Sequence, residues 1–245
     1  MNYESQIVKN ISELIRRIEN TCECIGRNPN EIKLLLATKT VSGENIKIAL
    51  QAGYTLIGEN KVQEIKEKFD TLKDIPHVKH YIGHLQTNKI KDILKYNVSC
   101  IQSLDRLELA EKLHSRLTFE QKTINAFIQV NTSGEESKFG INPENVIELA
   151  KQVAELNTVK IQGLMTIGLF SAETEEVRKC FQLLKNIQQQ IITENIPNVK
   201  MNELSMGMSG DLETAIEEGA TIIRIGTAIF GKRIYPDSYY WNENK

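Results

Sequence analysis

Lys39 is the first residue of this chain whose position suggests chemistry. It lies two residues past the apolar run of residues 34–37, so its amine is expected to lie partly out of water. Loss of water lowers the pKa of an ammonium group and exposes a nucleophilic amine, which is the setting of lysines that form Schiff bases. A solvated lysine just past a strand would show the same local pattern. The groups around Lys39 must therefore decide between the two interpretations.

Hydroxyl side chains and glycines gather in two segments late in the chain. The first segment holds Ser205, Gly207 and Ser209, and the second holds Gly226 and Thr227. Loops of this composition bind phosphate through backbone N–H groups and hydroxyls. The first segment also precedes an expected helix, so part of its pattern would occur in any capped helix. Taken together, the two segments favour a phosphate site.

Arg224 lies inside an apolar strand-like run, residues 222–226, on the face opposite its isoleucine neighbours. A guanidinium in so apolar a run needs a partner. One alternative is an ion pair with Glu203 or Glu59. The other is a pyridine ring lying between Lys39 and the phosphate site, to whose nitrogen Arg224 would donate a hydrogen bond.

The rest of the chain predicts the fold that would position these residues. Short apolar runs, which suit buried parallel strands, alternate with amphipathic segments, which suit helices. After a first helix over residues 5–24, strands are expected at 33–38, 55–57, 79–82, 98–102, 123–130, 159–167, 201–204 and 221–225, with helices at 44–52, 61–72, 88–94, 105–117, 143–156, 174–192 and 212–218. This α/β alternation favours a single (β/α)₈ TIM barrel over an open doubly wound sheet. The Gly-x-Gly-x-x-Gly fingerprint of dinucleotide-binding sheets is also absent after the first strand.

We expect one domain over residues 1–245, with an additional N-terminal helix in 1–30, the barrel in 31–232 and a tail in 233–245. Active sites of such barrels lie at the carboxyl ends of the strands. Lys39, Asn60 and His84 follow the first three expected strands, and the phosphate-type segments follow the last two. All of these residues are therefore expected around one mouth.

Composition and charge exclude several classes of function. The chain has 30 basic and 32 acidic residues and a formal net charge of -2, which provides no field for nucleic acid or an anionic membrane. No run approaches the roughly 18 apolar residues of a membrane span, and the first residues carry no signal-peptide pattern. We expect a cytoplasmic protein without nucleic-acid or membrane partners. The four cysteines are expected to be reduced and structural, and no metal site is predicted.

Several motifs closely resemble the pyridoxal phosphate homeostasis protein family, the YggS/PROSC-type proteins, over almost the whole chain and in the same order. The motifs are Leu36-Ala37-Thr38-Lys39-Thr40, Ile57-Gly58-Glu59-Asn60, Ile82-Gly83-His84-Leu85-Gln86-Thr87-Asn88-Lys89, Leu204-Ser205-Met206-Gly207-Met208-Ser209-Gly210-Asp211 and Ile223-Arg224-Ile225-Gly226-Thr227-Ala228-Ile229-Phe230-Gly231. That family shares its fold with the amino-terminal barrel of alanine racemase.

The resemblance implies a pyridoxal 5′-phosphate cofactor held as a Schiff base on Lys39. It further implies phosphate contacts from Ser205, Gly226 and Thr227, and Arg224 facing the ring nitrogen. Asn60 would lie beside the ring. Met206 is expected either in the core or in the wall of the cofactor site. Such a protein acts in vitamin B6 homeostasis, and PLP-dependent apoenzymes are expected as transient partners of a monomer.

Three functions remain open at this level. The first is a carrier that binds the cofactor without strong turnover. An arginine at the ring nitrogen favours this function because it weakens carbanion stabilisation. We also expect no counterpart of the second domain that supplies a tyrosine base in alanine racemase, which favours the carrier too. The second is a single-domain amino-acid racemase whose other base would be His84 or one of the tail tyrosines Tyr235, Tyr239 and Tyr240. The third is a barrel for another phosphorylated metabolite, with Lys39 as a simple cation.

Overall fold

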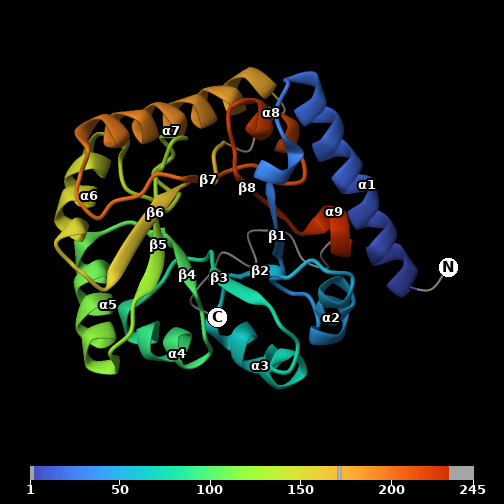
Figure 1. Ribbon diagram of the computed structural model, residues 1–245, viewed down its shortest axis with the longest axis horizontal. Helices are drawn as coiled ribbons and strands as arrows, with labels where there is room; N and C mark the ends of the chain where they lie inside the picture. Colours follow the sequence, from blue (N-terminus) through green and yellow to red (C-terminus); the bar gives the residue numbers. More distant parts are fainter. Residues whose placement is uncertain (1–2, 170, 172, 232–245) are drawn as a thin grey trace.

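Eight parallel strands close into a barrel in the order β1 to β8 (Figure 1). This computed structural model describes residues 3–169, 171 and 173–231. The strands are β1 (Lys33–Ala37), β2 (Leu56–Glu59), β3 (Val78–Tyr81), β4 (Cys100–Leu104), β5 (Ile124–Gln129), β6 (Val159–Met165), β7 (Glu203–Ser205) and β8 (Ile222–Ile225). The pairing of β1 with β8 closes the barrel.

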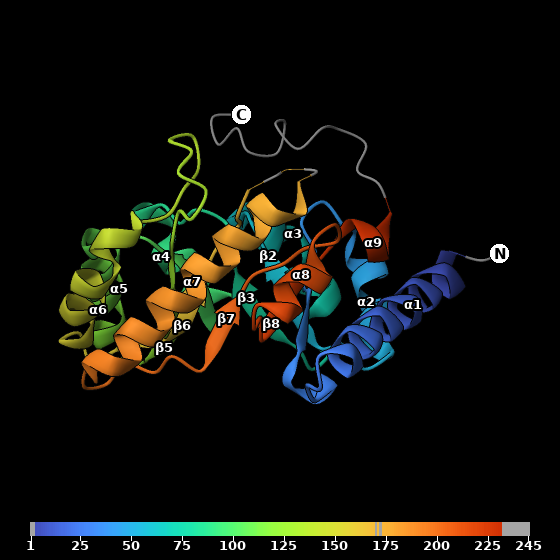
Figure 2. The same ribbon diagram turned by 90° about the horizontal axis from the view of Figure 1, so that it is seen from above.

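Helices form a ring around the strands, as Figures 1 and 2 show from two directions. They are α1 (Tyr3–Cys24), α2 (Gly43–Gln51), α3 (Val62–Leu72), α4 (Ile90–Lys95), α5 (Leu107–Glu120), α6 (Val146–Ala154), α7 (Thr174–Glu194), α8 (Leu212–Glu217) and α9 (Thr227–Phe230). Short 3-10 turns occur at Pro29–Glu31, Thr87–Lys89 and Pro143–Asn145. Within the described residues, none of the helices combines the length and the apolarity needed to cross a membrane.

The expected barrel with its N-terminal helix is confirmed. Most strand ends lie within a few residues of the expected ones. The largest offset is at β4, which runs over Cys100–Leu104 instead of 98–102. The helix α9, a single turn directly after β8, was not expected. The tail at 233–245, with its three tyrosines, lies outside the described residues.

Alternating side chains divide the apolar residues into two cores. Residues on the outer face of the strands pack against the helices and form the larger core. Residues on the inner face fill the barrel, and its buried centre consists of Leu35, Cys100, Phe127, Met165 and Ile222. Because the centre is packed, the two ends of the barrel are separate sites.

Candidate functional site

Lys39 lies in the turn that follows β1, at the carboxyl end of the barrel, and is half-buried. The Thr38 N–H donates to the Gly58 carbonyl at 2.9 Å, so the pairing with β2 extends past the end of β1. Leu35 belongs to the barrel interior, and alternation puts Lys39 on the same face. The lysine is therefore placed at the inner edge of the mouth.

Behind β1, a buried ammonium group holds the residue before Lys39. Lys68 on α3 donates to the Thr38 carbonyl oxygen at 2.8 Å and to Glu59 Oε1 at 2.9 Å. The Thr38 hydroxyl donates to the same Glu59 oxygen at 2.7 Å. All three side chains are less than 10 % exposed. The carboxyl end of β1 is thus fixed by a network reaching β2 and α3.

The residue after Lys39 is held by the same helix. Glu64 Oε2 accepts from the Thr40 backbone N–H at 2.7 Å and from Lys68 Nζ at 2.8 Å. Thr40 has a φ of 65°, a left-handed conformation that costs energy for a residue with a β-branched side chain. The contact with Glu64 helps to hold the turn in that conformation and so fixes the direction in which Lys39 leaves the strand.

Glu59 is unusual among the carboxylates of the chain. It is 1 % exposed, and its Oε2 has no hydrogen-bond partner. Burial raises the pKa of Glu59 to about 7, against the opposing effect of Lys68. Because the side chain faces α3 and not the mouth, we interpret it as part of the support for Lys39.

Arg224 on β8 points into the barrel, next to β1. The register pairs it with Leu35, so Lys39 lies four residues further toward the mouth on the neighbouring strand. Arg224 donates to Ser205 Oγ at 2.9 Å and to the Thr166 carbonyl oxygen at 2.7 Å. It is 5 % exposed, and burial lowers its pKa to about 10, which leaves it protonated at neutral pH.

The ion pair that the sequence offered as one alternative for Arg224 is wrong. Glu203 pairs with Lys33, and Glu59 pairs with Lys68. No ion pair among the described residues includes Arg224, although the charge of Asp211 raises its pKa against the effect of burial. A buried guanidinium without a carboxylate in contact can donate a hydrogen bond to an uncharged or anionic ligand atom at the mouth.

A cluster of hydroxyl and N–H donors lies at the mouth after β7 and β8. Thr227 Oγ1 donates to Ser209 Oγ at 3.2 Å, and the Ala228 N–H donates to the same oxygen at 3.4 Å. Thr227 is exposed and Ser209 is half-buried, so both hydroxyls are accessible. Gly226 precedes them, and a side chain there would approach the Ala37 carbonyl oxygen to 2.9 Å. The structure therefore brings Gly226 and Thr227 together with Ser209.

Ser205 and Met206 are not part of this cluster. Both are fully buried, and the side chain of Met206 packs in the larger core. Ser205 ends β7 and faces into the barrel below the mouth, where it donates to Gln102 Oε1 at 2.6 Å. Neither side chain exposes surface in this structure, and the phosphate contact of Ser205 and the position of Met206 in the wall of the site stay predictions.

A glycine turn explains the difference between the two serines. Gly207 has a φ of 91°, and a side chain on it would meet Ala215 Cβ at 2.5 Å. Only glycine fits here, and the chain turns outward from β7 at this residue. Ser205 therefore stays inside the barrel, whereas Ser209 reaches the rim.

Asn60 follows β2 and lies beside Gly83, which follows β3. The close approach requires glycine, since a Cβ on Gly83 would meet the Asn60 carbonyl oxygen at 2.1 Å. The side-chain Oδ1 of Asn60 is buried and has no hydrogen-bond partner. A buried amide oxygen without a donor is costly unless a ligand supplies one.

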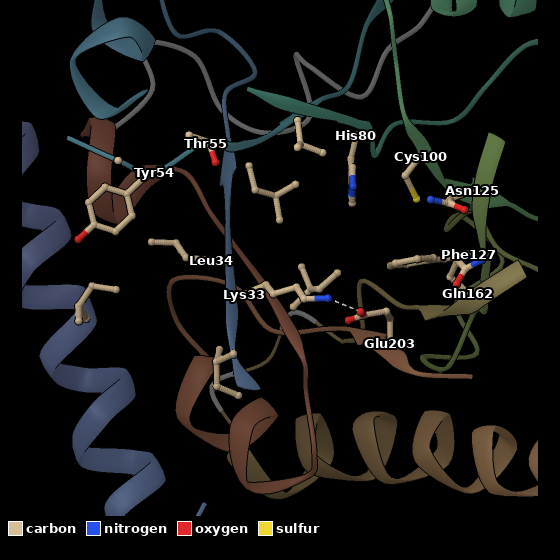
Figure 3. A pocket seen from close by; sticks show the side chains of 16 residues that line it. Lys33, Leu34, Tyr54, Thr55, His80, Cys100, Asn125, Phe127, Gln162 and Glu203 are labelled. Carbon is tan, nitrogen blue, oxygen red and sulfur yellow. Dashed lines mark hydrogen bonds and ion pairs between the residues drawn. The ribbon is translucent and has the colours of Figure 1, made fainter. Parts of the chain in front are cut away.

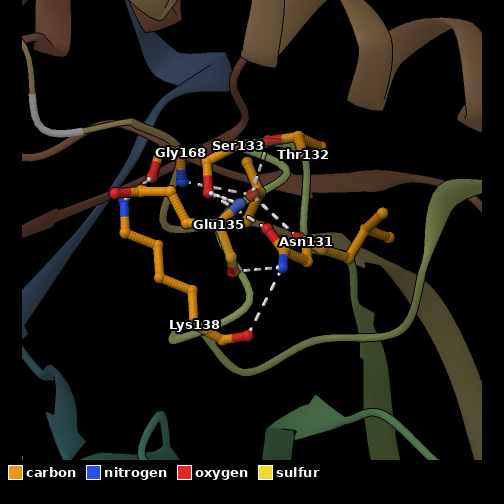
Figure 4. A network of polar contacts seen from close by, with 8 residues as sticks. Asn131, Thr132, Ser133, Glu135, Lys138 and Gly168 are labelled. Atoms are coloured by element: carbon orange, nitrogen blue, oxygen red, sulfur yellow. Dashed lines mark hydrogen bonds and ion pairs between the residues drawn. The ribbon is translucent and has the colours of Figure 1, made fainter.

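The loop after β5 forms another part of the rim and projects beyond the ring of helices (Figure 2). Lys138 donates to the Gly168 carbonyl oxygen at 2.8 Å and pairs with Glu135 (Figure 4). The Asn131 side chain donates to the Glu135 carbonyl oxygen at 2.9 Å and so closes this loop on itself. These contacts make Lys138 a structural residue of the loop.

His84 stacks on Phe139 from the same loop, with ring centroids 4.1 Å apart and planes at 18°. Its Nδ1 lies 3.5 Å from Asp105 Oδ2. The pair Lys68 and Glu64 and the interior residue Gln102 were not identified from the sequence. The motif around Glu59 pointed to this region of the structure. That Lys68 on α3 is the partner of Glu59 follows only from contacts between residues distant in sequence.

The fold and the mouth define a class of barrel proteins. The family model "Alanine racemase, N-terminal domain" matches residues 13–234. Among solved structures, an alanine racemase from Clostridium difficile shares the fold, with a TM-score of 0.77 and 14 % identity, over 95 % of this chain and 58 % of that one. The chain is thus a barrel of the alanine racemase N-terminal type.

Curated relatives identify the family within that class. A pyridoxal phosphate homeostasis protein from Aquifex aeolicus is 44 % identical over 92 % of this chain and 97 % of its own length. PipY of Synechococcus elongatus, whose structure contains bound PLP, is 30 % identical with a TM-score of 0.81, over 92 % of this chain and 100 % of that one. The chain belongs to the pyridoxal phosphate homeostasis protein family.

Proposed function

We propose that this chain binds pyridoxal 5′-phosphate at the carboxyl end of its barrel and acts in the homeostasis of that cofactor. Lys39 holds it covalently as a Schiff base. The hydroxyls of Ser209 and Thr227 and the backbone at Gly226 contact its phosphate. Arg224 faces its ring nitrogen, and Asn60 lies beside the ring.

One observation carries this proposal. Lys39 and Arg224 lie on the inner face of adjacent strands, and the buried Arg224 has no carboxylate partner among the described residues. A ring that accepts a hydrogen bond from Arg224 would satisfy one of its remaining donors. A phosphate dianion at the Ser209 cluster would balance charge in a mouth that contains a lysine and an arginine. The residues present therefore fit the cofactor.

The same arginine argues for binding without strong turnover. When bound, the cofactor supplies an electrophilic carbonyl carbon and an electron-accepting ring. Arg224 keeps its own proton at neutral pH, because its pKa is about 10, and can only donate to the ring nitrogen. A ring nitrogen that receives no proton withdraws fewer electrons, which disfavours racemase and transaminase chemistry.

An absorption spectrum of the purified protein incubated with pyridoxal phosphate tests the proposal. We expect a visible band that is absent from Lys39→Ala protein. A phosphorylated ligand without an aldehyde, pyridoxine 5′-phosphate, controls for phosphate binding alone. Tight binding of that ligand without any visible band from pyridoxal phosphate would favour the barrel for another phosphorylated metabolite.

The proposal extends to the setting in which the protein acts. We propose a single-domain, monomeric protein of the cytoplasm that transfers the cofactor to PLP-dependent apoenzymes through transient contacts. The near-neutral charge of the chain supports a partner other than nucleic acid or membrane.

A further inference from the structure

A second cavity, of about 580 Å³, lies at the opposite end of the barrel from Lys39. The first residues of several strands line it, among them Lys33 of β1, Cys100 of β4 and Ile222 of β8 (Figure 3). Cavities of 300–1,000 Å³, in order of magnitude, hold small-molecule ligands. This end of a TIM barrel ordinarily serves stability, so polar groups in such a cavity need an explanation.

A chain of hydrogen bonds links Arg224 to this cavity through the inside of the barrel. Arg224 donates to Ser205 Oγ at 2.9 Å, and Ser205 donates to Gln102 Oε1 at 2.6 Å. Gln102 Nε2 lies 2.7 Å from Nδ1 of His80, which lines the cavity. Ser205 and Gln102 are fully buried, so each partner is required.

Arg224 fixes the direction of donation along this series of hydrogen bonds. A guanidinium has donors only, so Ser205 must accept from Arg224 and use its own proton toward Gln102. The amide oxygen of Gln102 is then occupied, and its NH₂ group donates to His80 Nδ1. Burial and the nearby Lys33 lower the pKa of His80 to about 4, so the ring is neutral and carries its single proton on Nε2. The chain therefore ends in an N–H donor at the cavity.

The other lining groups indicate what this donor would meet. His80 points into the cavity, and the ring of Phe127 lies on its apolar wall (Figure 3). Lys33 adds an ammonium group at the edge, paired with Glu203 and 54 % exposed. The amides of Asn125 and Gln162 supply further donors. Glu203 also lines the cavity, but its oxygens already accept from Lys33 and from the Thr221 hydroxyl. The neutral N–H donor of His80, the exposed ammonium group of Lys33 and the apolar wall together suit a carboxylate on a small apolar body.

We propose that this cavity is a second binding site, for a small aliphatic carboxylate that accepts a hydrogen bond from His80 Nε2 and lies near Lys33. The hydrogen-bond chain makes the site sensitive to whatever Arg224 contacts at the other end of the barrel. That sensitivity rests on the proposed function, whereas the binding itself does not.

The test uses 3-methylbutanoate, which has no amine and therefore cannot react with a cofactor on Lys39. Titration followed by NMR of the His80 imidazole protons should give saturation with a Kd of about 1 mM. The neutral 3-methylbutanamide should bind about tenfold more weakly, because it lacks the charge. L-Leucine in a further arm distinguishes an amino acid from a simple carboxylate as the preferred ligand. It is measured on Lys39→Ala protein to avoid reaction at the mouth.

Variants locate the binding. Lys33→Gln should weaken 3-methylbutanoate about tenfold, and His80→Phe, followed by calorimetry, should weaken it at least as much. The matched control is Lys122→Gln, since Lys122 is 53 % exposed and also pairs with a glutamate, Glu120, but does not line the cavity. No saturation with wild-type protein, or equal Kd values in all of these proteins, would overturn the proposal.

The link between the two ends has its own readout. Loading with pyridoxal phosphate should change the Kd of 3-methylbutanoate about fivefold, and by reciprocity the carboxylate should change cofactor retention by the same factor. Gln102→Leu interrupts the chain and should remove this effect. An unchanged Kd in loaded wild-type protein would overturn the link. If the protein binds 3-methylbutanoate but shows no visible absorption band with pyridoxal phosphate, the proposed function is contradicted and the second binding site is still supported.

Discussion

Lys68 Nζ lies 2.8 Å from the carbonyl oxygen of Thr38, the residue immediately before Lys39. The same ammonium group contacts Glu64, which in turn holds the backbone N–H of Thr40. One buried lysine on α3 therefore connects to both neighbours of Lys39. The orientation of Lys39 depends on this support as well as on β1.

Removal of the Lys68 ammonium group should destabilise the protein strongly. Lys68→Met leaves the buried Glu59 carboxylate without its cation, and breaking a buried pair in this way costs about 3 kcal/mol. Urea unfolding gives the loss. Lys66→Met is the matched control, since Lys66 lies on the same helix, pairs with Asp92 at 3.0 Å and is 38 % exposed. Lys66→Met should lower the free energy of unfolding by less than about 1 kcal/mol. An equal loss in both variants would contradict the structural role of the buried Lys68.

Ser209→Ala combined with Thr227→Val should weaken retention of pyridoxal phosphate far more than retention of pyridoxal. Each hydrogen bond to the charged phosphate contributes roughly 1.5–3 kcal/mol, and pyridoxal lacks that group. Equilibrium dialysis of both ligands measures the difference. Ser205→Ala is the control, because its hydroxyl contacts Arg224 and Gln102 and should affect both ligands alike. If Ser205→Ala weakens retention of pyridoxal phosphate but not of pyridoxal, Ser205 contacts the phosphate.

His80 should contribute a loss of stability between pH 6.5 and pH 4, opposite in sign to the gain from protonation of Glu59, whose pKa is raised to about 7. The pKa of His80 is lowered from 6.5 to about 4 in the folded chain. The unfolded chain therefore binds the proton first as the pH falls, and stability present above pH 6.5 is lost. A shift of this size corresponds to about 3–4 kcal/mol. Urea unfolding at several pH values should show that His80→Phe lacks this part of the slope. Parallel curves for the two proteins would rule out the shift.

Wild-type protein should catalyse little exchange of the α-proton of amino acids. In the proposed complex Arg224 would donate to the ring nitrogen and leave it unprotonated, so a carbanion at the α-carbon would be poorly stabilised. The measurement is deuterium incorporation from heavy water, compared with free pyridoxal phosphate at equal concentration. Rapid exchange with inversion, lost in Lys39→Ala, would support the racemase instead, and His84 would then be the first base to replace.

The barrel was predictable because buried parallel strands have short apolar sequences, and the helices between them have amphipathic ones. Residues 34–37 and 222–225 show this pattern, and both became strands of the closed barrel. The position of Lys39 after the first strand followed directly. The single turn α9 was missed because four residues are too few to show a helical period.

The contacts of individual side chains were not predictable in the same way. Ser205 and Ser209 have the same side chain and lie close in sequence, and only the turn at Gly207 separates the interior one from the accessible one. Lys68 lies on an amphipathic helix, where a lysine is expected to be exposed to solvent. Its burial results from the approach of α3 to β1, which no local pattern contains.

The central claim is that Lys39 holds the cofactor covalently. Borohydride reduction of protein loaded with pyridoxal phosphate, followed by peptide mass mapping, tests it most directly. The account predicts one major adduct, on Lys39, and its loss in Lys39→Ala protein that still folds. An adduct found chiefly on the exposed Lys89 or on Lys138, with Lys39 unmodified, would contradict it.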